Sequence, residues 1–503
     1  MSDSERVGMV NQSSEVSSMK QSLLLLWLVC LFTALCNVGK CDVVVYKAPE
    51  GEGLNVKFKV SVDGIDVPVY NAKIGHEDKT EREKAMDRRL ESEKYFDLAG
   101  IAYFDLKKGP VTITVFVEEQ VTSAKILPTS SGLSPTISGK TLSFAVDKPQ
   151  HVTVEVNGDH IRSLHISVNP EEKDIPDPND PNVIYFGPGI HEITSVLVGD
   201  DKTVYIAGGA IVRGITGEDE QWSPSRQYPG LRNYRGQSFI LRGKNITFRG
   251  RGIVDQEGVR THGRQMISAT VDGLKMEGVV LRNSSVWTLS LRDCKNVHID
   301  NIKILGHRAN SDGIDINSSF DVLVENCFLR TLDDLVVVKT LRGTGEAGRI
   351  RVRKCVLWNE VAHALSIGAE LTQKVEDVVF EDCDVIGDHG REWTLRIYHT
   401  DSALIKNVRF ENIRIEESVR FASLWINTAV WTTDAKRGRI EDVVFKDITV
   451  STDKPIRRGF EFSGYDAEHA IRNVHIENVV INGERVTKED VMMNEHVFNV
   501  TVK

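Results

Sequence analysis

The chain has 503 residues, of which 41% are hydrophobic and 27% are charged. This composition is typical of a globular protein, and the length favours two domains over one small domain. The formal net charge is −10 and the sequence contains no basic block, which argues against nucleic acid and anionic membrane surfaces as partners.

The first 42 residues contain one long apolar run. Residues 19–42 (MKQSLLLLWLVCLFTALCNVGKCD) have a lysine at their second position, an apolar centre, and small and polar residues at the end. The run is short for a bilayer span, so residues 1–42 are predicted to be a secretory signal peptide with a polar extension, and Met19 is a candidate start of translation. The mature protein is then expected to be secreted or periplasmic, without a membrane partner. A signal anchor or a buried helix is the alternative.

Residues 43–168 are predicted to form a small N-terminal β-sandwich. Short segments in which apolar and polar residues alternate recur through this region, for example residues 111–117 (VTITVFV) and 141–146 (TLSFAV). The segment that follows, residues 169–182 (NPEEKDIPDPNDPN), is rich in Pro, Asp and Asn, and we predict that it is a linker.

From about residue 183 the chain is built from a repeat. A nine-residue phrase, such as NVHIDNIKI at position 296 and NVRFENIRI at position 407, occurs nine times at intervals of 23–35 residues. Each phrase alternates with period two around a polar pair, which indicates strand, turn and strand. Several strands per coil predict a right-handed parallel β-helix over residues 183–485, with residues 486–503 as a C-terminal tail. The chain is therefore predicted to be all-β, a right-handed parallel β-helix preceded by the small β-sandwich domain.

Three cysteines support the predicted stacking of equivalent positions in successive coils. Cys327, Cys355 and Cys383 occupy the seventh position of successive phrases, where other coils have Ile or Val. Because equivalent positions of stacked coils lie about 4.8 Å apart, we predict an interior ladder of reduced thiols that behave as small hydrophobic side chains. Their spacing fits no zinc-binding pattern.

A second short strand follows most of the phrases and brings acidic residues together. Asp312 precedes the strand GIDI, Asp334 precedes LVVV and His363 precedes ALSI, so these three residues take the same place on successive coils. Asp333 is the neighbour of Asp334. The carboxylates of Asp312, Asp333 and Asp334 are therefore predicted to lie within several ångströms of one another, on the outside of the coil stack.

Aromatic residues extend the same ladder. Trp287 stands one coil earlier and Trp393 one coil later, each just before a strand. Within the strands Arg396 and, one coil later, Trp425 share the outward parity. These side chains are candidates for binding a sugar, since aromatic rings stack on sugar faces.

Close carboxylates cannot all ionise at the usual pH, so one of them should hold its proton to higher pH. A proton donor beside ionised carboxylates is what the cleavage of a glycosidic bond requires. The alternative is an Asp ladder that caps turns or binds calcium, although calcium prefers more oxygen ligands than this cluster offers. We predict no metal.

The motifs resemble those of glycoside hydrolase family 28, the polygalacturonases. Residues 310–315 (NSDGID) resemble the N-T-D-G motif of that family, and residues 332–340 (LDDLVVVKT) resemble its D-D motif. Residues 362–370 (AHALSIGAE) resemble G-H-G-L-S-I-G-S, and residues 395–400 (LRIYHT) resemble R-I-K. The resemblance covers roughly residues 183–480.

The resemblance implies an inverting hydrolase that acts on a polysaccharide or oligosaccharide without a cofactor. Asp333 would be the general acid, and Asp312 and Asp334 would position and activate the water. His363 and Arg396 would bind substrate or tune the acid. We expect a monomer.

Two features depart from the family. Tyr398 stands where the family has a lysine that helps to hold the carboxylate of the substrate, and the preceding sandwich is more similar to family 49, the dextranases and isopullulanases. A neutral glucan or a galactan is therefore an alternative to galacturonan, with Tyr398 as a substrate-binding residue. A β-helix polysaccharide lyase and a non-catalytic glycan binder are two further classes.

Overall fold

The structure, a computed structural model, describes residues 42–81, 84, 93–225, 230–453, 455–456 and 458–503. The predicted signal peptide, residues 1–42, lies outside the described residues except for Asp42. Among the described residues, no helix has the length and apolar character needed to cross a membrane.

The N-terminal domain consists of two sheets that pack on each other. The first sheet contains β1 (Val43–Val44), β4 (Val69–Gly75), β5 (Phe96–Leu106), β7 (Ala124–Leu127), β10 (Gln150–Val156) and β11 (Asp159–Pro170). The second contains β2 (Phe58–Val62), β3 (Ile65–Val67), β6 (Val111–Val117), β8 (Thr136–Ser138) and β9 (Thr141–Val146). A short 3-10 helix, η2 (Thr129–Ser131), follows β7. Apolar residues from both sheets share one core, so the β-sandwich predicted from alternating segments is confirmed.

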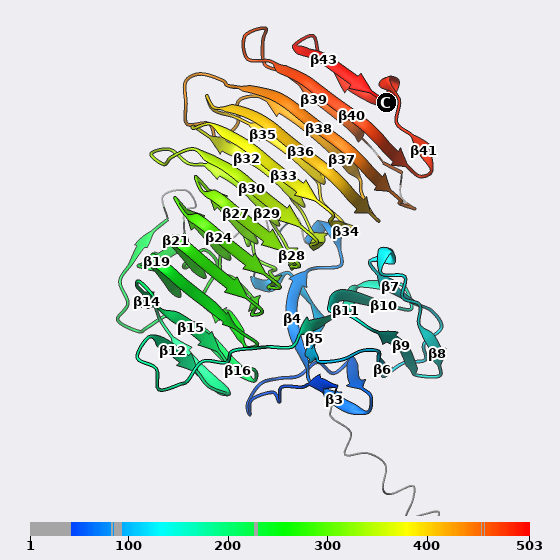
Figure 1. The fold of residues 1–503 in the computed structure, drawn as a ribbon, viewed down its shortest axis with the longest axis vertical. Coiled ribbons are helices and arrows are strands. Elements are labelled where there is room, and N and C mark those ends of the chain that lie inside the picture. Colours follow the sequence, from blue (N-terminus) through cyan, green and yellow to red (C-terminus); the bar gives the residue numbers. More distant parts are fainter. Residues whose placement is uncertain (1–41, 82–83, 85–92, 226–229, 454, 457) are drawn as a thin grey trace, which may run out of the picture.

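The remainder of the chain is a parallel β-helix, as predicted, and it rises from the green to the red strands in Figure 1. Its strands form three series, and within each series every coil pairs in parallel with the next. The first series contains β12 (Val183–Phe186), β15 (Thr203–Ile206), β19 (Phe239–Gly250), β21 (Ile267–Glu277), β24 (Lys295–Asp300), β27 (Phe320–Glu325), β30 (Ala347–Arg353), β33 (Val375–Glu381), β36 (Leu404–Ile415), β38 (Arg439–Val450), β40 (Ile471–Ile481) and β43 (Val497–Val502).

The second series contains β13 (Gly189–Ile193), β16 (Ala210–Ile215), β20 (Ile253–Gly258), β22 (Val280–Arg282), β25 (Lys303–Leu305), β28 (Phe328–Thr331), β31 (Val356–Asn359) and β34 (Asp384–Asp388). The third contains β14 (Val196–Val198), β23 (Leu289–Arg292), β26 (Ile314–Asn317), β29 (Val336–Thr340), β32 (Leu365–Leu371), β35 (Leu395–His399), β37 (Arg420–Ile426), β39 (Arg458–Ser463) and β42 (Val491–Met493). The first residues of β19 and β21 also pair within the third series. A hairpin of β17 (Trp222–Pro224) and β18 (Arg232–Tyr234) projects from the early coils, and β41 (Glu484–Arg485) and the 3-10 helix η3 (Lys488–Asp490) lie near the end.

The repeated phrase is a strand, a left-handed bend and a strand. Its sixth residue has a positive φ in successive coils, for example 53° at Asn301, 52° at Asn326 and 50° at Asn412. Asn, Asp and Gly enter this region at the lowest cost, which explains the polar residue in the middle of an otherwise apolar phrase. The bend turns the chain from the first strand series into the second.

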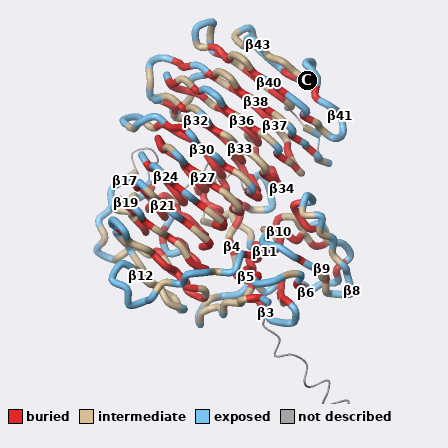
Figure 2. The backbone as a smooth tube through the Cα atoms, in the orientation of Figure 1, coloured by how far each residue is buried: buried red, intermediate tan, exposed pale blue. Residues whose placement is uncertain are grey.

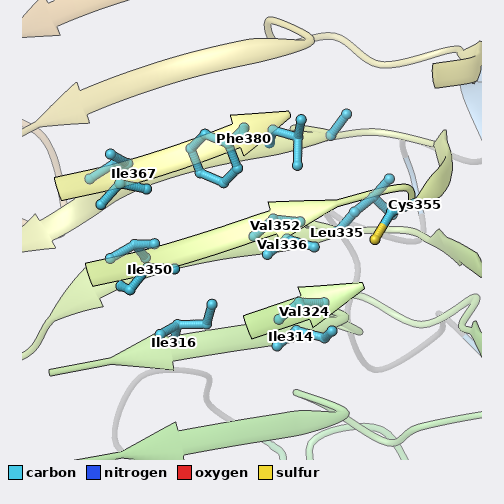
Figure 3. Packing of buried hydrophobic residues seen from close by; sticks show 14 of the residues in the cluster. Ile314, Ile316, Val324, Leu335, Val336, Ile350, Val352, Cys355, Ile367 and Phe380 are labelled. Atoms are coloured by element: carbon cyan, nitrogen blue, oxygen red, sulfur yellow. The ribbon is translucent and has the colours of Figure 1, made fainter. Parts of the chain in front are cut away.

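Inside the coils, equivalent apolar residues stack directly on one another. Figure 3 shows Val324 and Val352 above each other, with Phe380 on the following coil. Phe380, Phe410 and Phe445 continue this row, with ring centroids 5.1 and 5.0 Å apart. The row therefore follows the spacing between strands, and Figure 2 shows the buried residues running along the strands while the turns are exposed.

The predicted cysteine ladder is confirmed. Cys327, Cys355 and Cys383 are free thiols, and all three are buried in the core of the β-helix. The thiols of Cys327 and Cys383 lie on either side of Cys355 and, together with burial, hold its pKa well above the usual value.

The sandwich covers the outer side of the second strand series. Tyr70, Ile101 and Tyr103 of the sandwich share one buried cluster with Phe328 and Trp358 of the β-helix. Buried ion pairs reinforce this interface: Arg251 Nε donates to Asp105 Oδ1 at 2.8 Å. The second series is therefore closed off by the sandwich, and the third series is left to carry a pocket.

Two strands extend beyond the predicted limits of their segments. β11 of the sandwich continues to Pro170, two residues beyond residue 168. Residues 491–493 and 497–502, which the sequence analysis assigned to a tail, pair in parallel with β39 and β40 and extend the stack. Val497, Val500 and Val502 pack against the core of the β-helix.

Candidate active site

The third strand series lines up the predicted site residues. In successive strands of this series each residue pairs with the next in the order Leu289, Ile314, Val336, Leu365 and Leu395. The residues two positions before each of these therefore form one row along the helix axis, namely Trp287, Asp312, Asp334, His363 and Trp393. Backbone hydrogen bonds hold this row together, since the amide after Asp312 donates to the carbonyl of Asp334 at 2.8 Å and the amide after Asp334 donates to the carbonyl of His363 at 2.9 Å.

A pocket of about 550 Å³ opens over this row. This volume lies within the usual range of ligand sites, roughly 300–1,000 Å³. All nine predicted site residues line it: Trp287, Asp312, Asp333, Asp334, His363, Trp393, Arg396, Tyr398 and Trp425. Residues from coils that are more than 130 positions apart in sequence thus contribute to one cavity because the repeat brings them together.

Trp425 has the outward parity predicted for it. Arg396 pairs with Ser423 and Trp425 pairs with Tyr398, so Arg396 and Trp425 lie two strand positions apart on the same face, because side chains alternate with period two. The alternation in the segment FASLWI predicts the face but not the pairing partner.

The three aspartates form a compact cluster. One oxygen from each of Asp312, Asp333 and Asp334 lies within 4.8 Å of the others. Asp312 and Asp334 are buried, with 2% and 9% of their surface exposed, whereas Asp333 is only half-buried. Asp333 accepts hydrogen bonds from Asn310 Nδ2 at 3.3 Å and from the backbone amide of Asp334 at 3.0 Å.

Burial sets the protonation of this cluster. Removal from water and the charges of neighbouring carboxylates raise the pKa of Asp312 and of Asp334 well above the usual value. A carboxyl buried among carboxylates is easier to keep neutral than ionised. Burial and mutual repulsion thus favour the neutral forms of Asp312 and Asp334, and the cluster titrates as a coupled group.

A buried lysine lies among the carboxylates, and the sequence analysis missed it. Lys339 Nζ is 3.1 Å from Asp315 Oδ1 and 3.5 Å from Asp312 Oδ2, and only 5% of the residue is exposed. Burial raises the pKa of Asp315 to about 6, and Lys339 opposes this rise. The sequence does contain a signal for this position. Lys339 follows Val337 by two residues and so points to the same side of the strand, and Val337 pairs with Asp315.

His363 is neutral in this setting. Its Nδ1 donates to the backbone carbonyl of Trp393 at 2.8 Å, and burial lowers its pKa to about 3. This bond fixes the ring and leaves Nε2 as the remaining nitrogen in the pocket. His363 thus contributes a neutral polar group beside Asp334.

Arg396 is enclosed by three aromatic rings. Its guanidinium carbon lies 4.2 Å from the ring centroid of Tyr398, 4.8 Å from that of Trp393 and 5.1 Å from that of Trp425. Its Nη1 forms an ion pair with Glu392 at 2.5 Å, and its Nε is buried without a hydrogen-bond partner. Flat rings and a planar cation therefore make one wall of the pocket.

Further lining residues were not among the predicted ones. His262, Asn310, Glu392 and Trp431 lie outside the strands, where there is no repeat to follow, whereas Glu370 lies near the end of β32 and Arg420 begins β37. Trp431 follows β37, and its ring centroid lies 6.3 Å from that of Tyr398. Arg420 continues the row beyond Trp393, whose adjacent amide, that of Thr394, donates to the carbonyl of Arg420 at 2.9 Å.

The cluster of three carboxylates has oxygens close enough to approach a single cation. The ammonium of Lys339 already supplies a positive charge beside Asp312. The same arrangement suits proton transfer: a half-buried carboxyl faces the pocket, two buried carboxyls lie behind it, and a neutral imidazole stands beside them.

Comparison with known proteins agrees with this geometry. The family model for glycosyl hydrolases family 28 matches residues 239–500, slightly more than half of the chain. An exopolygalacturonase from Zea mays is 22% identical over 242 residues, covering 43% of this chain and 57% of that protein. An endo-polygalacturonase from Pectobacterium carotovorum subsp. carotovorum is 27% identical over 215 residues, covering 39% and 50%. The chain therefore spans about half the length of the curated relatives it matches.

Solved structures show the same fold. Dex49A from Penicillium minioluteum aligns with a TM-score of 0.65 at 12% identity, covering 91% of this chain and 96% of that one. A hyperthermoactive exopolygalacturonase from Thermotoga maritima aligns with a TM-score of 0.52 at 16% identity, covering 63% and 82%. The first alignment spans nearly the whole chain and shows a shared fold, while the family model includes all three aspartates. On these grounds the chain belongs to glycosyl hydrolases family 28.

Proposed function

We propose that the protein hydrolyses glycosidic bonds in a polysaccharide, with Asp333 as the general acid and with Asp312 and Asp334 activating the water. The observation that carries this proposal is the compact carboxylate cluster in a sugar-sized pocket, where the half-buried Asp333 faces the cavity and Asp312 and Asp334 are buried behind it. The names of the related polygalacturonases support the same reaction class.

In the proposed reaction, Asp333 donates its proton to the glycosidic oxygen while the bond between that oxygen and the anomeric carbon breaks. A water held by Asp312 and Asp334 attacks the anomeric carbon and passes a proton to one of these carboxylates. Asp333 is suited to donation because it is the most exposed of the three and reaches the pocket. The buried pair is suited to holding the water because each has one oxygen without a hydrogen-bond partner.

The carboxylates are closer than inverting enzymes usually place their acid and base. The closest oxygens lie within 4.8 Å, whereas a separation of roughly 6.5–9.5 Å is typical. We propose inversion nevertheless, because two buried carboxylates flank one water site and share a single task. The anomer released first is therefore a direct readout of this assignment.

The test is Asp333→Asn in the full chain. The amide keeps the shape of the carboxyl but carries no proton to donate, so kcat should fall by about two to four orders of magnitude. Asp321→Asn is the matched control, since Asp321 is an exposed aspartate that pairs with Arg349 on the surface. Release of reducing ends from a panel of glycans measures the activity, and circular dichroism verifies the fold.

The outcomes separate the candidate classes. New reducing ends without an unsaturated, ultraviolet-absorbing product indicate a hydrolase, whereas that product indicates a lyase. A folded Asp333→Asn variant with near-normal kcat would refute the general-acid role. Binding of glycans without turnover by the wild type would favour a non-catalytic binder.

We also propose that the protein is exported by the apolar segment at residues 19–42. The support is the sequence pattern alone, since the segment lies outside the described residues apart from Asp42. Expression with this segment and detection of a shortened N-terminus in the medium or periplasm would support export. Retention of the full-length chain in the cytoplasm would refute it.

A further inference from the structure

The charged groups of the pocket do not favour an anionic sugar. Five carboxylates line it: Asp312, Asp333, Asp334, Glu370 and Glu392. Four cations line it: Lys339, Arg391, Arg396 and Arg420. A site that selects a uronic acid needs a cation whose charge is available to the carboxylate of the substrate.

The two cations nearest the carboxylate cluster are already paired within the protein. Lys339 lies between Asp312 and Asp315, at 3.5 and 3.1 Å. Arg396 is paired with Glu392 and is 3% exposed. A substrate carboxylate would have to compete with these protein carboxylates.

Glu370 adds a further negative charge at this point. It lies on β32 beside the carboxylate cluster, and its charge helps to raise the pKa of Asp334 and of Lys339. A uronate bound next to the cluster would be repelled by Glu370 as well as by the aspartates.

The remaining two cations lie farther out. Arg420 stands three coils beyond Asp334 in the same row, which is roughly 14 Å at the spacing of β-strands. Arg391 lies on the loop that also carries Glu392. The guanidinium carbon of Arg420 lies 5.0 Å from the ring centroid of Trp393, at the end of the aromatic wall that is farther from the carboxylate cluster.

What the pocket does offer is aromatic surface. Trp393 and Trp425 lie with ring centroids 4.9 Å apart, and Tyr398 lies 6.2 Å from Trp425. Trp431, which is 43% exposed, stands edge to face with Tyr398 at 6.3 Å. Rings of this kind bind the C–H faces of sugars without requiring a charge on the ligand.

The wall also has polar groups that have no hydrogen-bond partner among the described residues. The indole Nε1 of Trp393, the indole Nε1 of Trp425 and the Nε of Arg396 are buried donors without an acceptor, and Ser366 Oγ is buried beside them. Buried donors are rarely left unpaired, so the ligand should supply the acceptors. Sugar hydroxyl oxygens accept such bonds and carry no charge.

We infer that the sugar ring bound at this wall, next to the carboxylate cluster, is a neutral hexose held by ring stacking and hydrogen bonds, and is not a uronic acid. The inference rests on the proposed function and narrows its substrate to a neutral polysaccharide. It differs from the activity in the names of the related polygalacturonases. Tyr398, Glu370 and Glu392 are the residues to which it assigns this specificity.

The first experiment measures reducing ends released from polygalacturonate and from soluble neutral glycans, namely dextran, pullulan, agarose and arabinogalactan. We expect turnover of at least one neutral glycan, with kcat/KM at least tenfold above that for polygalacturonate. Polygalacturonate as the best substrate would overturn the inference and leave the hydrolase assignment intact. No turnover of any glycan would overturn the hydrolase assignment, and a second measurement then decides the inference.

The second measurement is binding, which does not depend on turnover. Asp333→Asn is titrated with neutral oligosaccharides of the same series and with tri-galacturonate, and tryptophan fluorescence reports occupancy of the aromatic wall. We expect the neutral ligand to bind more tightly and with little dependence on salt. Tighter binding of tri-galacturonate that weakens with salt, or binding of no neutral ligand, would overturn the inference.

The third experiment converts the specificity. Tyr398→Lys combined with Glu370→Gln adds one cation and removes one carboxylate, and Glu392→Gln releases Arg396. Both variants should raise the ratio of tri-galacturonate binding to neutral-ligand binding. The variant that combines Tyr398→Lys with Glu370→Gln should raise it by about tenfold or more. Glu346→Gln is the matched control, because Glu346 lies on an exposed turn outside the pocket. An unchanged ratio in both variants would show that these residues do not set the specificity.

Discussion

Replacing Lys339 by methionine should move the acidic limb of the pH–activity profile to higher pH. Lys339 is the cation closest to the carboxylates that the proposed mechanism uses as a base, and methionine keeps a similar length without the charge. The positive charge favours the ionised form of Asp312, so its loss raises the pKa of that carboxyl further. The base must be ionised to accept a proton from water, and it then ionises only at higher pH.

The structure sets the size of the shift. Two unit charges 4 Å apart interact by about 4 kcal/mol at an effective dielectric constant of about 20, which corresponds to about three pKa units. Lys339 divides its interaction between Asp312 at 3.5 Å and Asp315 at 3.1 Å, and the cluster titrates as a coupled group. We therefore expect the acidic limb of kcat/KM to move up by about one to two pH units.

The assay is kcat/KM between pH 4 and pH 9 for the wild type and three variants. At pH 5 Lys339→Met should lose about ten- to a hundredfold in kcat/KM relative to the wild type, and it should recover most of this loss as the pH rises. Lys339→Arg keeps the charge and should leave the limb near its original place. Lys374→Met is the control for losing an ammonium elsewhere, since Lys374 pairs with Glu376 on the surface.

A uniform loss of activity at every pH would refute this reasoning, because it would indicate damage to the shape of the site without a change in protonation. A shift of the acidic limb to lower pH would refute the sign of the electrostatic argument. A limb that moves equally in Lys339→Arg would show that packing, not charge, is what Lys339 contributes.

Three further predictions follow from other parts of the molecule. The stacked thiols of Cys327, Cys355 and Cys383 should react slowly with a thiol reagent in the folded protein and rapidly after denaturation. Their replacement by valine should lower the free energy of unfolding by no more than about 1.5 kcal/mol. Rapid labelling of all three in the native state would contradict their interior position. Nuclear magnetic resonance of the first product should show the inverted anomer, and a retained anomer would instead assign a buried aspartate as nucleophile. Asp105→Ala should lower the free energy of unfolding by about 3–5 kcal/mol, because it removes the carboxylate that pairs with the buried guanidinium of Arg251. Asp321→Ala breaks an exposed pair and should lower it by about 1 kcal/mol or less. Equal losses in urea denaturation would show that the Asp105–Arg251 pair does not stabilise the buried interface.

The sequence predicted the parts of the site that the repeat controls. Asp312, Asp334 and His363 could be aligned because each stands directly before an apolar strand, and strands in a parallel stack pair at a fixed register. The inward position of Cys355 followed from the same alternation. A regular coil thus converts a spacing of 20–30 residues in sequence into neighbours in space.

The features that were missed depend on interactions that alternation does not encode. Alternation predicts the face of Trp425 but not its pairing with Tyr398, because a shift of two residues keeps the same face outward. Glu392 lies on a turn between coils, and its contact with Arg396 is set by the path of that turn. The packing of Tyr103 against the β-helix needed the relative position of two domains, which no local pattern contains.

The role of each coil is fixed by what lies on its outer side. The second strand series is covered by the sandwich through Tyr70 and Ile101, and its outward side chains are buried: apolar ones such as Phe328 pack there, and Arg282 is paired with Asp255 and Glu52. Among the described residues, the third series opens into the pocket, so polar side chains can stand there at a cost that a ligand would offset by supplying hydrogen bonds. The indole donors of Trp393 and Trp425, which have no acceptor among the described residues, lie on this side. Under the proposed function, the coils that present carboxylates for cleavage are followed, one strand spacing at a time, by coils that present rings and hydrogen-bond donors for the sugar.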